Sequence, residues 1–170
     1  MDAGLVIASK REVREYADQA LPDDVRRRIL DAGRLAGSAQ NRQLRRFVVV
    51  ESSEVREHLA ELVFAPGNIR GAALVVAIVV WGKGPTAFDA GRAAQNMMLA
   101  AWNEGVGSCP NGTTDADAVH SVLGLGEDER VAVTLSFGYP AHPRDPAART
   151  PEEWSRGAGR KRLDELVETR

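Results

Sequence analysis

The stretch ALVVAIVVW, residues 73–81, decides the fold of this chain. All nine residues are apolar and most are β-branched, which is typical of a strand buried on both faces of a sheet. The run is about half as long as a membrane-spanning helix needs to be. It therefore predicts a strand in a sheet that helices cover on both sides.

The segments around this strand alternate between strand and helix patterns. Short apolar runs predict further strands at 47–51 and 131–140, the second one stopped by a proline. Helices are predicted to open at Leu21-Pro22-Asp23-Asp24 and to cover 53–64, 88–104 and 115–123. This alternation predicts an α+β domain built as three layers, α/β/α.

The helix predicted over 88–104 differs from the others because it is apolar nearly all round. Such a helix should be buried, and its small residues, among them Gly91 and Ala94, allow a second backbone to approach closely. Either the rest of the chain or a second copy of it covers the remaining face. We favour the second copy and therefore a homodimer.

Beyond Pro140 the chain has no clear hydrophobic period and is rich in proline, glycine and charge. We expect residues 141–170 to form an extended C-terminal arm of a single domain that spans residues 1–170. The arm contains the basic triplet 160–162 and then a short amphipathic stretch.

The composition narrows the function classes. Of 170 residues, 44% are hydrophobic and 27% charged, and the formal net charge is −2. This balance gives no general attraction to nucleic acid or to an anionic membrane. Cys109 is the only cysteine, which excludes an internal disulfide and a thiolate metal cluster. The first nine residues do not resemble a secretory signal, so we expect a soluble cytoplasmic protein.

The standard catalytic motifs are missing. The three histidines fit no metal spacing, and the chain has neither a GxSxG nor a Walker A sequence. Gly105-Val106-Gly107 follows a helix and lacks the third glycine of a dinucleotide-binding loop. Polar residues gather instead in four segments, at 9–16, 36–47, 105–112 and 160–162.

These segments resemble the FMN-dependent nitroreductase family. Residues 10–16, KREVREY, follow the family's Arg-Arg-Ser-x-Arg-x-aromatic pattern except at one position, and residues 37–44, GSAQNRQL, follow Pro-Ser-x-x-Asn-x-Gln-Pro. Residues 89–96, DAGRAAQN, follow Asp-x-Gly-x-Ala-x-Gln-Asn, and residues 105–108, GVGS, follow Gly-Leu-Gly-Ser. Together with the basic arm, these motifs span nearly the whole chain in the family's order.

The resemblance implies a mixed, mainly antiparallel sheet flanked by helices, in an intertwined homodimer whose C-terminal arms complete it and whose interface holds FMN. It also implies a ping-pong reaction, in which NAD(P)H reduces the flavin at N5 and then leaves. A small planar organic acceptor, such as a nitroaromatic or a quinone, is reduced next. The flavin carries this chemistry, so no side chain is expected to act as a catalytic acid or base, and no metal is expected.

The resemblance also implies roles for individual residues. The cations for the flavin phosphate are Lys10, Arg11, Arg160 and Lys161. The segment for the ribityl chain and the pyrimidine edge contains Gly37, Ser38, Asn41 and Gln43. Arg14 stands where the family places a cation near N1 and the C2 carbonyl, and the segment whose backbone passes N5 is Pro110, Asn111 and Gly112. The structural alternatives are that Ser38 and Asn41 only cap and turn a helix end, and that the terminal cations are only solvated.

Two of the departures from the family pattern matter for the cofactor. Glu12 replaces a serine that donates to the phosphate, and a carboxylate there repels the phosphate unless it turns away toward Arg45 or Arg46. Leu44 replaces a proline. Both leave open a non-catalytic or diverged member of the fold that binds flavin or deazaflavin, or a different oxidation on the same fold. The connection 82–87 is short, so we expect an open site.

Overall fold

A four-stranded antiparallel sheet organises residues 11–143, the larger of two compact units in a computed structural model that describes residues 1–170. The strands are β1 (Arg45–Val49), β2 (Leu74–Val80), β3 (Gly107–Asn111) and β4 (Arg130–Gly138), in the spatial order β1-β2-β4-β3. All three ladders are antiparallel, and an isolated bridge between Glu12 and Ser108 is parallel. The mainly antiparallel sheet is confirmed.

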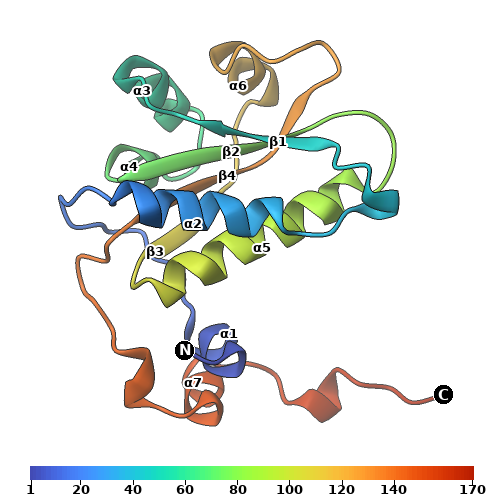
Figure 1. Ribbon diagram of the computed structural model, residues 1–170. Helices are drawn as coiled ribbons and strands as arrows, with labels where there is room; N and C mark the ends of the chain where they lie inside the picture. The colour runs from blue at the N-terminus through green and yellow to red at the C-terminus, as the bar shows by residue number, and fades with distance from the viewer. The chain divides into compact units, whose positions relative to one another are not determined.

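The second strand, β2, lies at the centre of this unit, as the stretch 73–81 predicts. Every residue of β2 is buried. Leu74, Val76 and Ile78 point into one core, and Val75 points into the other. Helices α2 (Asp23–Arg34) and α5 (Thr86–Asn103) cover the first face of the sheet (Figure 1). The second face carries α3 (Ser53–Glu61), α4 (Pro66–Arg70) and α6 (Ala116–Val122), which confirms the three layers.

Strand β3 is a correction to the sequence-based expectation of a glycine-rich loop at 105–112. Residues 107–111 pair with β4 from Gly107 opposite Gly138 to Asn111 opposite Thr134. The segment has no large apolar side chain and contains a proline, so no hydrophobic pattern marks it as a strand. Its place at the edge of the sheet is where a proline is tolerated.

The smaller unit joins the two ends of the chain, residues 1–10 and 144–170. It contains α1 (Ala3–Ser9), η2 (Pro146–Ala148), α7 (Pro151–Gly157) and η3 (Leu163–Glu165), and α1 packs against α7. A capping box between Thr150 and Glu153 starts α7, and the Trp154 indole N–H donates to the Pro146 carbonyl over 2.8 Å. The expected arm is therefore not extended throughout.

Candidate functional site

The segment 11–16 runs alongside β3. The Val13 backbone N–H donates to the Ser108 carbonyl over 3.0 Å. Gly107 permits this approach, because a Cβ atom at that position would lie 2.6–2.8 Å from the Val13 side chain. The structure thereby brings two of the predicted polar segments together, the one with Arg11 and Arg14 and the one that ends in 110–112.

Tyr16 fixes the far end of this segment against β4. Its hydroxyl lies 2.9 Å from the Ser136 hydroxyl and donates to the Ser136 carbonyl over 3.2 Å. The ring packs on Gly138, where an added Cβ would lie 2.8 Å from it. Burial raises the pKa of Tyr16 well above its ordinary range, so the hydroxyl remains a proton donor.

The side chain of Asn111 points into the protein and is buried. Its amide N–H groups donate to the Cys109 carbonyl over 3.0 Å and to the Ser136 hydroxyl over 3.1 Å, and its carbonyl accepts from the Asn68 amide over 2.8 Å. Pro110 and Gly112, on either side of Asn111, are exposed. A ligand at this segment therefore meets the backbone, as the resemblance implies, and not the Asn111 side chain.

The loop 37–43 lies before β1 and contains a short 3-10 helix, η1 (Ala39–Asn41). Gln40, Asn41 and Gln43 all adopt left-handed backbone conformations, with φ of 53–54°. The Ser38 hydroxyl holds the turn by accepting from the Gln43 N–H over 3.0 Å, while the side chains of Asn41 and Gln43 are exposed. Left-handed non-glycine residues concentrate at ligand-binding segments, since the surroundings must enforce them.

One face of α5 is exposed beside this loop in a single copy of the chain, and burial of that face by a second copy stays a prediction. The Phe88 side chain is 67% exposed, and the Arg92 guanidinium lies 5.8 Å from the centre of its ring. The same guanidinium packs on Gly37, where an added Cβ would lie 2.6 Å from it. A hollow of about 480 Å³ lies here, and its lining includes Leu35, Gly37, Phe88, Arg92 and Gln95.

The two predicted flavin-binding regions of the larger unit lie at different edges of the sheet. The loop 37–43 leads into β1, which forms one edge, whereas segments 11–16 and 110–112 lie at β3, which forms the other. A single copy of this unit therefore does not unite them.

The remaining predicted cations belong to the smaller unit. Lys10 follows α1, and Arg160 and Lys161 are exposed between α7 and η3. The third member of the basic triplet, Arg162, is ion-paired with Asp164 over 2.6 Å.

The arginines suggested as partners of Glu12 are engaged elsewhere, which corrects that hypothesis. Arg46 makes two hydrogen bonds of 2.7 Å to Glu129, and these lower the pKa of the Glu129 carboxyl to about 2. Arg45 donates to the Ala36 carbonyl at the end of α2, and burial lowers the pKa of its guanidinium. Glu12 is exposed and pairs through its backbone with β3.

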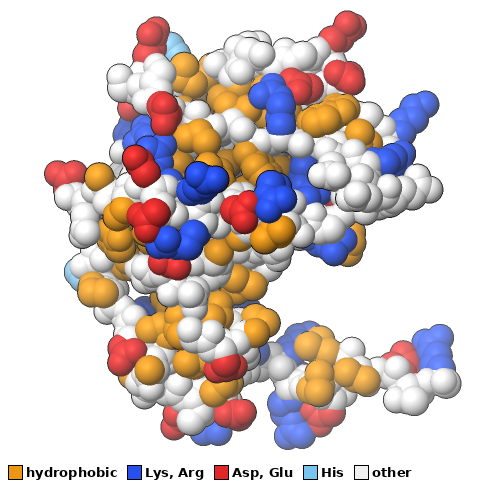
Figure 2. Space-filling model, viewed as in Figure 1, with side chains coloured by type: hydrophobic (Ala, Val, Ile, Leu, Met, Phe, Trp, Pro, Cys, Tyr) orange, Lys and Arg blue, Asp and Glu red, His pale blue; other side chains and the backbone are white.

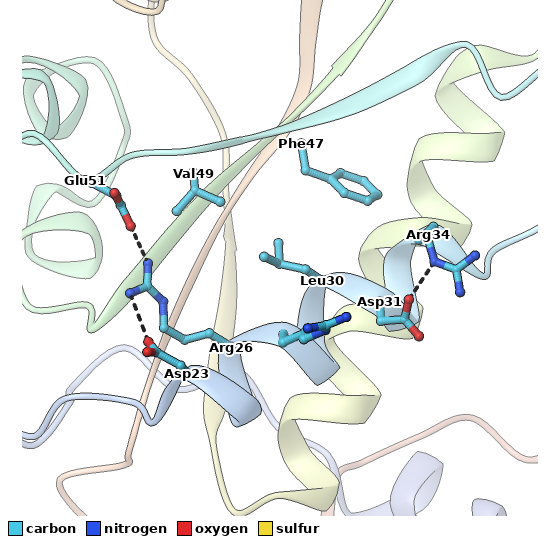
Figure 3. Close-up of a pocket in the computed structure, with 9 residues that line it drawn as sticks. Asp23, Arg26, Leu30, Asp31, Arg34, Phe47, Val49 and Glu51 are labelled. Atoms are coloured by element: carbon cyan, nitrogen blue, oxygen red, sulfur yellow. Dashed lines mark hydrogen bonds and ion pairs between the residues drawn. The ribbon is translucent and has the colours of Figure 1, made fainter.

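A second hollow, of about 710 Å³, lies between α2 and β1 (Figures 2 and 3). Leu30, Phe47 and Val49 form its apolar floor. At its rim Arg26 donates to Glu51 over 2.7 Å, and other rim charges are also ion-paired. None of the predicted flavin-binding residues lines it.

Comparison with known sequences gives one family. The model of the nitroreductase family matches residues 7–83 and 84–139. A provisionally assigned NADH dehydrogenase or NAD(P)H nitroreductase of Archaeoglobus fulgidus is 32% identical over 151 residues, which cover 82% of this chain and 86% of that protein. An NADPH-flavin oxidoreductase of Vibrio harveyi is 27% identical over 85% of this chain and 68% of its own length.

Solved structures agree on the fold. A nitroreductase family protein of Clostridium difficile has a TM-score of 0.82 at 22% identity, covering 99% of this chain and 98% of its own. A provisionally assigned nitroreductase of Desulfovibrio desulfuricans, solved in complex with FMN, has a TM-score of 0.82 at 26% identity and covers 100% and 98%. No helix of the present structure has the length and apolar character to cross a membrane.

Proposed function

The chain belongs to the nitroreductase family, and from this membership we propose that it is an FMN-dependent oxidoreductase that oxidises NAD(P)H. When bound, FMN would supply the hydride-transfer chemistry between a nicotinamide and an organic acceptor, in a ping-pong sequence. The observation that carries the proposal is the close pairing of segment 11–16 with β3. Because the chain has a single cysteine and cannot form an internal disulfide, we propose that it catalyses this reaction in a reducing cytoplasm.

The residues of the larger unit suit an isoalloxazine ring. Arg14 is exposed on a segment that lies against β3, where a cation favours the negative charge of a reduced flavin near N1. The exposed Pro110 and Gly112 leave the backbone accessible, as approach to N5 requires. Asn41 and Gln43 present exposed amides for the ribityl hydroxyls and the pyrimidine edge. Of the cations that the family resemblance proposes for the phosphate, Arg11 belongs to this unit, whereas Lys10, Arg160 and Lys161 belong to the smaller one.

The proposed working form is a homodimer. Because the loop 37–43 and the β3 region lie at opposite edges of one sheet, each cofactor is proposed to contact 37–43 of one subunit and β3 of the other. The exposed face of α5, with Phe88 and Gly91, is the proposed contact between the copies.

The proposed acceptor is a planar aromatic molecule, a nitroaromatic or a quinone. Phe64 is 78% exposed and is held beside the N5 segment, because its backbone N–H donates to the Gly112 carbonyl over 3.2 Å. Its ring lies 3.2 Å from where a Gly112 Cβ would be. A fixed exposed ring offers a planar molecule a surface for stacking. The short connection 82–87 leaves room for varied acceptors.

A second candidate function rests on Glu12, an exposed carboxylate in place of the family's serine. If it faces the phosphate, the protein binds flavin weakly and is a non-catalytic member of the fold or one that prefers another ligand, such as a deazaflavin. Glu12→Ser then tightens FMN strongly. Under the main proposal the same change alters FMN affinity little.

The test uses the purified full-length chain. We expect a yellow dimer whose flavin absorbance bleaches anaerobically with NADH or NADPH and returns on addition of a quinone. Phe64→Leu should raise the KM for quinone. A stable monomer, or bound flavin that neither nicotinamide reduces, would contradict the proposal.

A further inference from the structure

A buried line of polar side chains joins α4 to the edge of the sheet. Asn68 of α4, Asn111 of β3 and Ser136 of β4 are each at least 95% buried. The Asn68 amide donates to the Asn111 carbonyl over 2.8 Å, and the Asn111 amide donates to the Ser136 hydroxyl over 3.1 Å. The Tyr16 hydroxyl, 2.9 Å from the same Ser136 hydroxyl, ends the line.

Asn68 shares with backbone carbonyls the control of which way the Asn111 amide points. In the observed orientation the Asn111 carbonyl faces a donor, and its N–H groups face acceptors on Cys109 and Ser136. The reverse orientation would place the Asn111 carbonyl against the Cys109 carbonyl and leave donors facing the Asn68 donor. Buried groups without partners are costly, so the Asn68 donor and the Cys109 and Thr134 carbonyls together favour one orientation.

In that orientation the Asn111 side chain forms a hydrogen bond across Pro110. The Asn111 side chain donates to the Cys109 carbonyl over 3.0 Å, so the residues before and after Pro110 are tied to each other. Pro110 itself has no N–H to give to a neighbouring strand. The course of the backbone through 109–112 therefore depends on a side chain that Asn68 orients from a different element.

The same line reaches the cationic segment. Tyr16 follows Arg14 by two residues and meets Asn111 through one shared hydroxyl, that of Ser136. One hydrogen-bonded unit thus fixes both the segment that carries Arg14 and the segment 110–112. A fully satisfied buried network holds its members in one arrangement.

We propose that Asn68 is a positioning residue for the flavin: through Asn111 it fixes the backbone of 110–112 at N5. This inference rests on the proposed function, which places that backbone against the flavin. Asn68 touches no reacting atom in it.

The test compares Asn68→Leu with Ile69→Val in the full-length protein. Leucine has the same branched heavy-atom skeleton as Asn68 and removes its donor, whereas Ile69 is a fully buried neighbour on the same helix that makes no polar contact in the line. Two properties are measured: the FMN dissociation constant, and the flavin midpoint potential at saturating FMN. The potential is the deciding measurement, because loss of stability alone does not move it once the flavin is bound.

We expect Asn68→Leu to weaken FMN roughly tenfold, the effect of one buried hydrogen bond. We expect the loss to fall on one redox state of the flavin and to displace the midpoint potential by about 30 mV for a two-electron couple. Ile69→Val should change neither. If Asn68→Leu does not fold, Asn68→Ala, which removes the same donor without adding apolar bulk, is measured in its place with the same expected result.

Two results overturn the inference and are distinguishable. Wild-type protein that binds FMN, together with a folded Asn68→Leu variant of unchanged midpoint potential, refutes the positioning role alone, whatever the FMN affinity of that variant. An unchanged potential for Asn68→Ala does so if Asn68→Leu is unfolded. Wild-type protein that binds no FMN refutes the proposed function, and the positioning role falls with it.

Discussion

Gly107→Ala should destabilise the larger unit by forcing segment 11–16 off β3. The new Cβ would lie 2.6 Å from Val13 Cβ and 2.7 and 2.8 Å from its two methyl carbons, where carbon atoms prefer about 3.5–4.0 Å. Rotation of Val13 cannot relieve the contact with its own Cβ, so the backbone must move. Overpacking of this kind costs about 1–3 kcal/mol.

The assay is urea unfolding of four proteins: wild type, Gly107→Ala, Val13→Gly and the double variant. Because Val13→Gly removes every atom in the clash, the double variant should be at least about 1 kcal/mol more stable than the sum of the single effects predicts. Gly67→Ala is the matched control, since a Cβ at that position meets nothing within 4 Å. Its free energy of unfolding should equal or slightly exceed that of the wild type.

Additive effects of Val13→Gly and Gly107→Ala would refute the reasoning. So would a Gly107→Ala protein as stable as the Gly67→Ala control. Either result would mean that segment 11–16 does not lie on β3, and the placement of Arg14 beside 110–112 would lose its basis.

Three further predictions concern pH and capping. The hydrogen bonds from Arg46 lower the pKa of Glu129 from 4.5 to about 2, so the stability that they give is complete above pH 4.5 and is lost as pH falls toward 2. The stability of Glu129→Gln, measured by acid unfolding, should not fall in this way between pH 4.5 and 2. If its stability falls with pH as that of the wild type does, the ion pair is contradicted. Burial raises the pKa of Tyr16 above its ordinary value of 10.0, so stability should fall as pH rises past 10, where the unfolded chain ionises first; Tyr16→Phe should flatten that fall in urea titrations. Thr150→Ala removes the cap that receives the Glu153 N–H and should cost the start of α7 about 0.5–2 kcal/mol, seen as faster amide exchange in 151–157 but not in α5.

The hydrophobic pattern predicted the elements that bury apolar side chains on both sides. Strand β2 is buried throughout and is marked by its composition alone. Strand β3 has neither property: its five residues are glycine, serine, cysteine, proline and asparagine. What makes it a strand is pairing with β4 and the polar line behind it, and neither is visible in a local window of sequence.

Helix α7 was missed although its signal is present. Thr150-Pro151-Glu152-Glu153 is a capping box with proline in the first turn. The segment around it is rich in proline, glycine and charged residues and has no hydrophobic period, and this composition predicts an extended arm. Local capping chemistry outweighed composition here, because it satisfies the N–H groups that a helix start exposes.

The sequence predicts which residues could serve the site, and burial shows which of their atoms are turned inward. The side chain of Asn111 is buried and hydrogen-bonded inside the protein, and Asn68, which helps to orient it, lies on a five-residue helix that no pattern marks. Side-chain identity predicts what a residue is able to bond, whereas burial decides what it does bond. Residues 110 and 112 are exposed, whereas the side-chain amide of Asn111 is buried. A substitution that leaves residues 110–112 unchanged but removes a hydrogen bond to Asn111 therefore tests how far the position of this backbone matters for the flavin. Asn68 is remote in sequence and touches no reacting atom, so it is the informative residue to change.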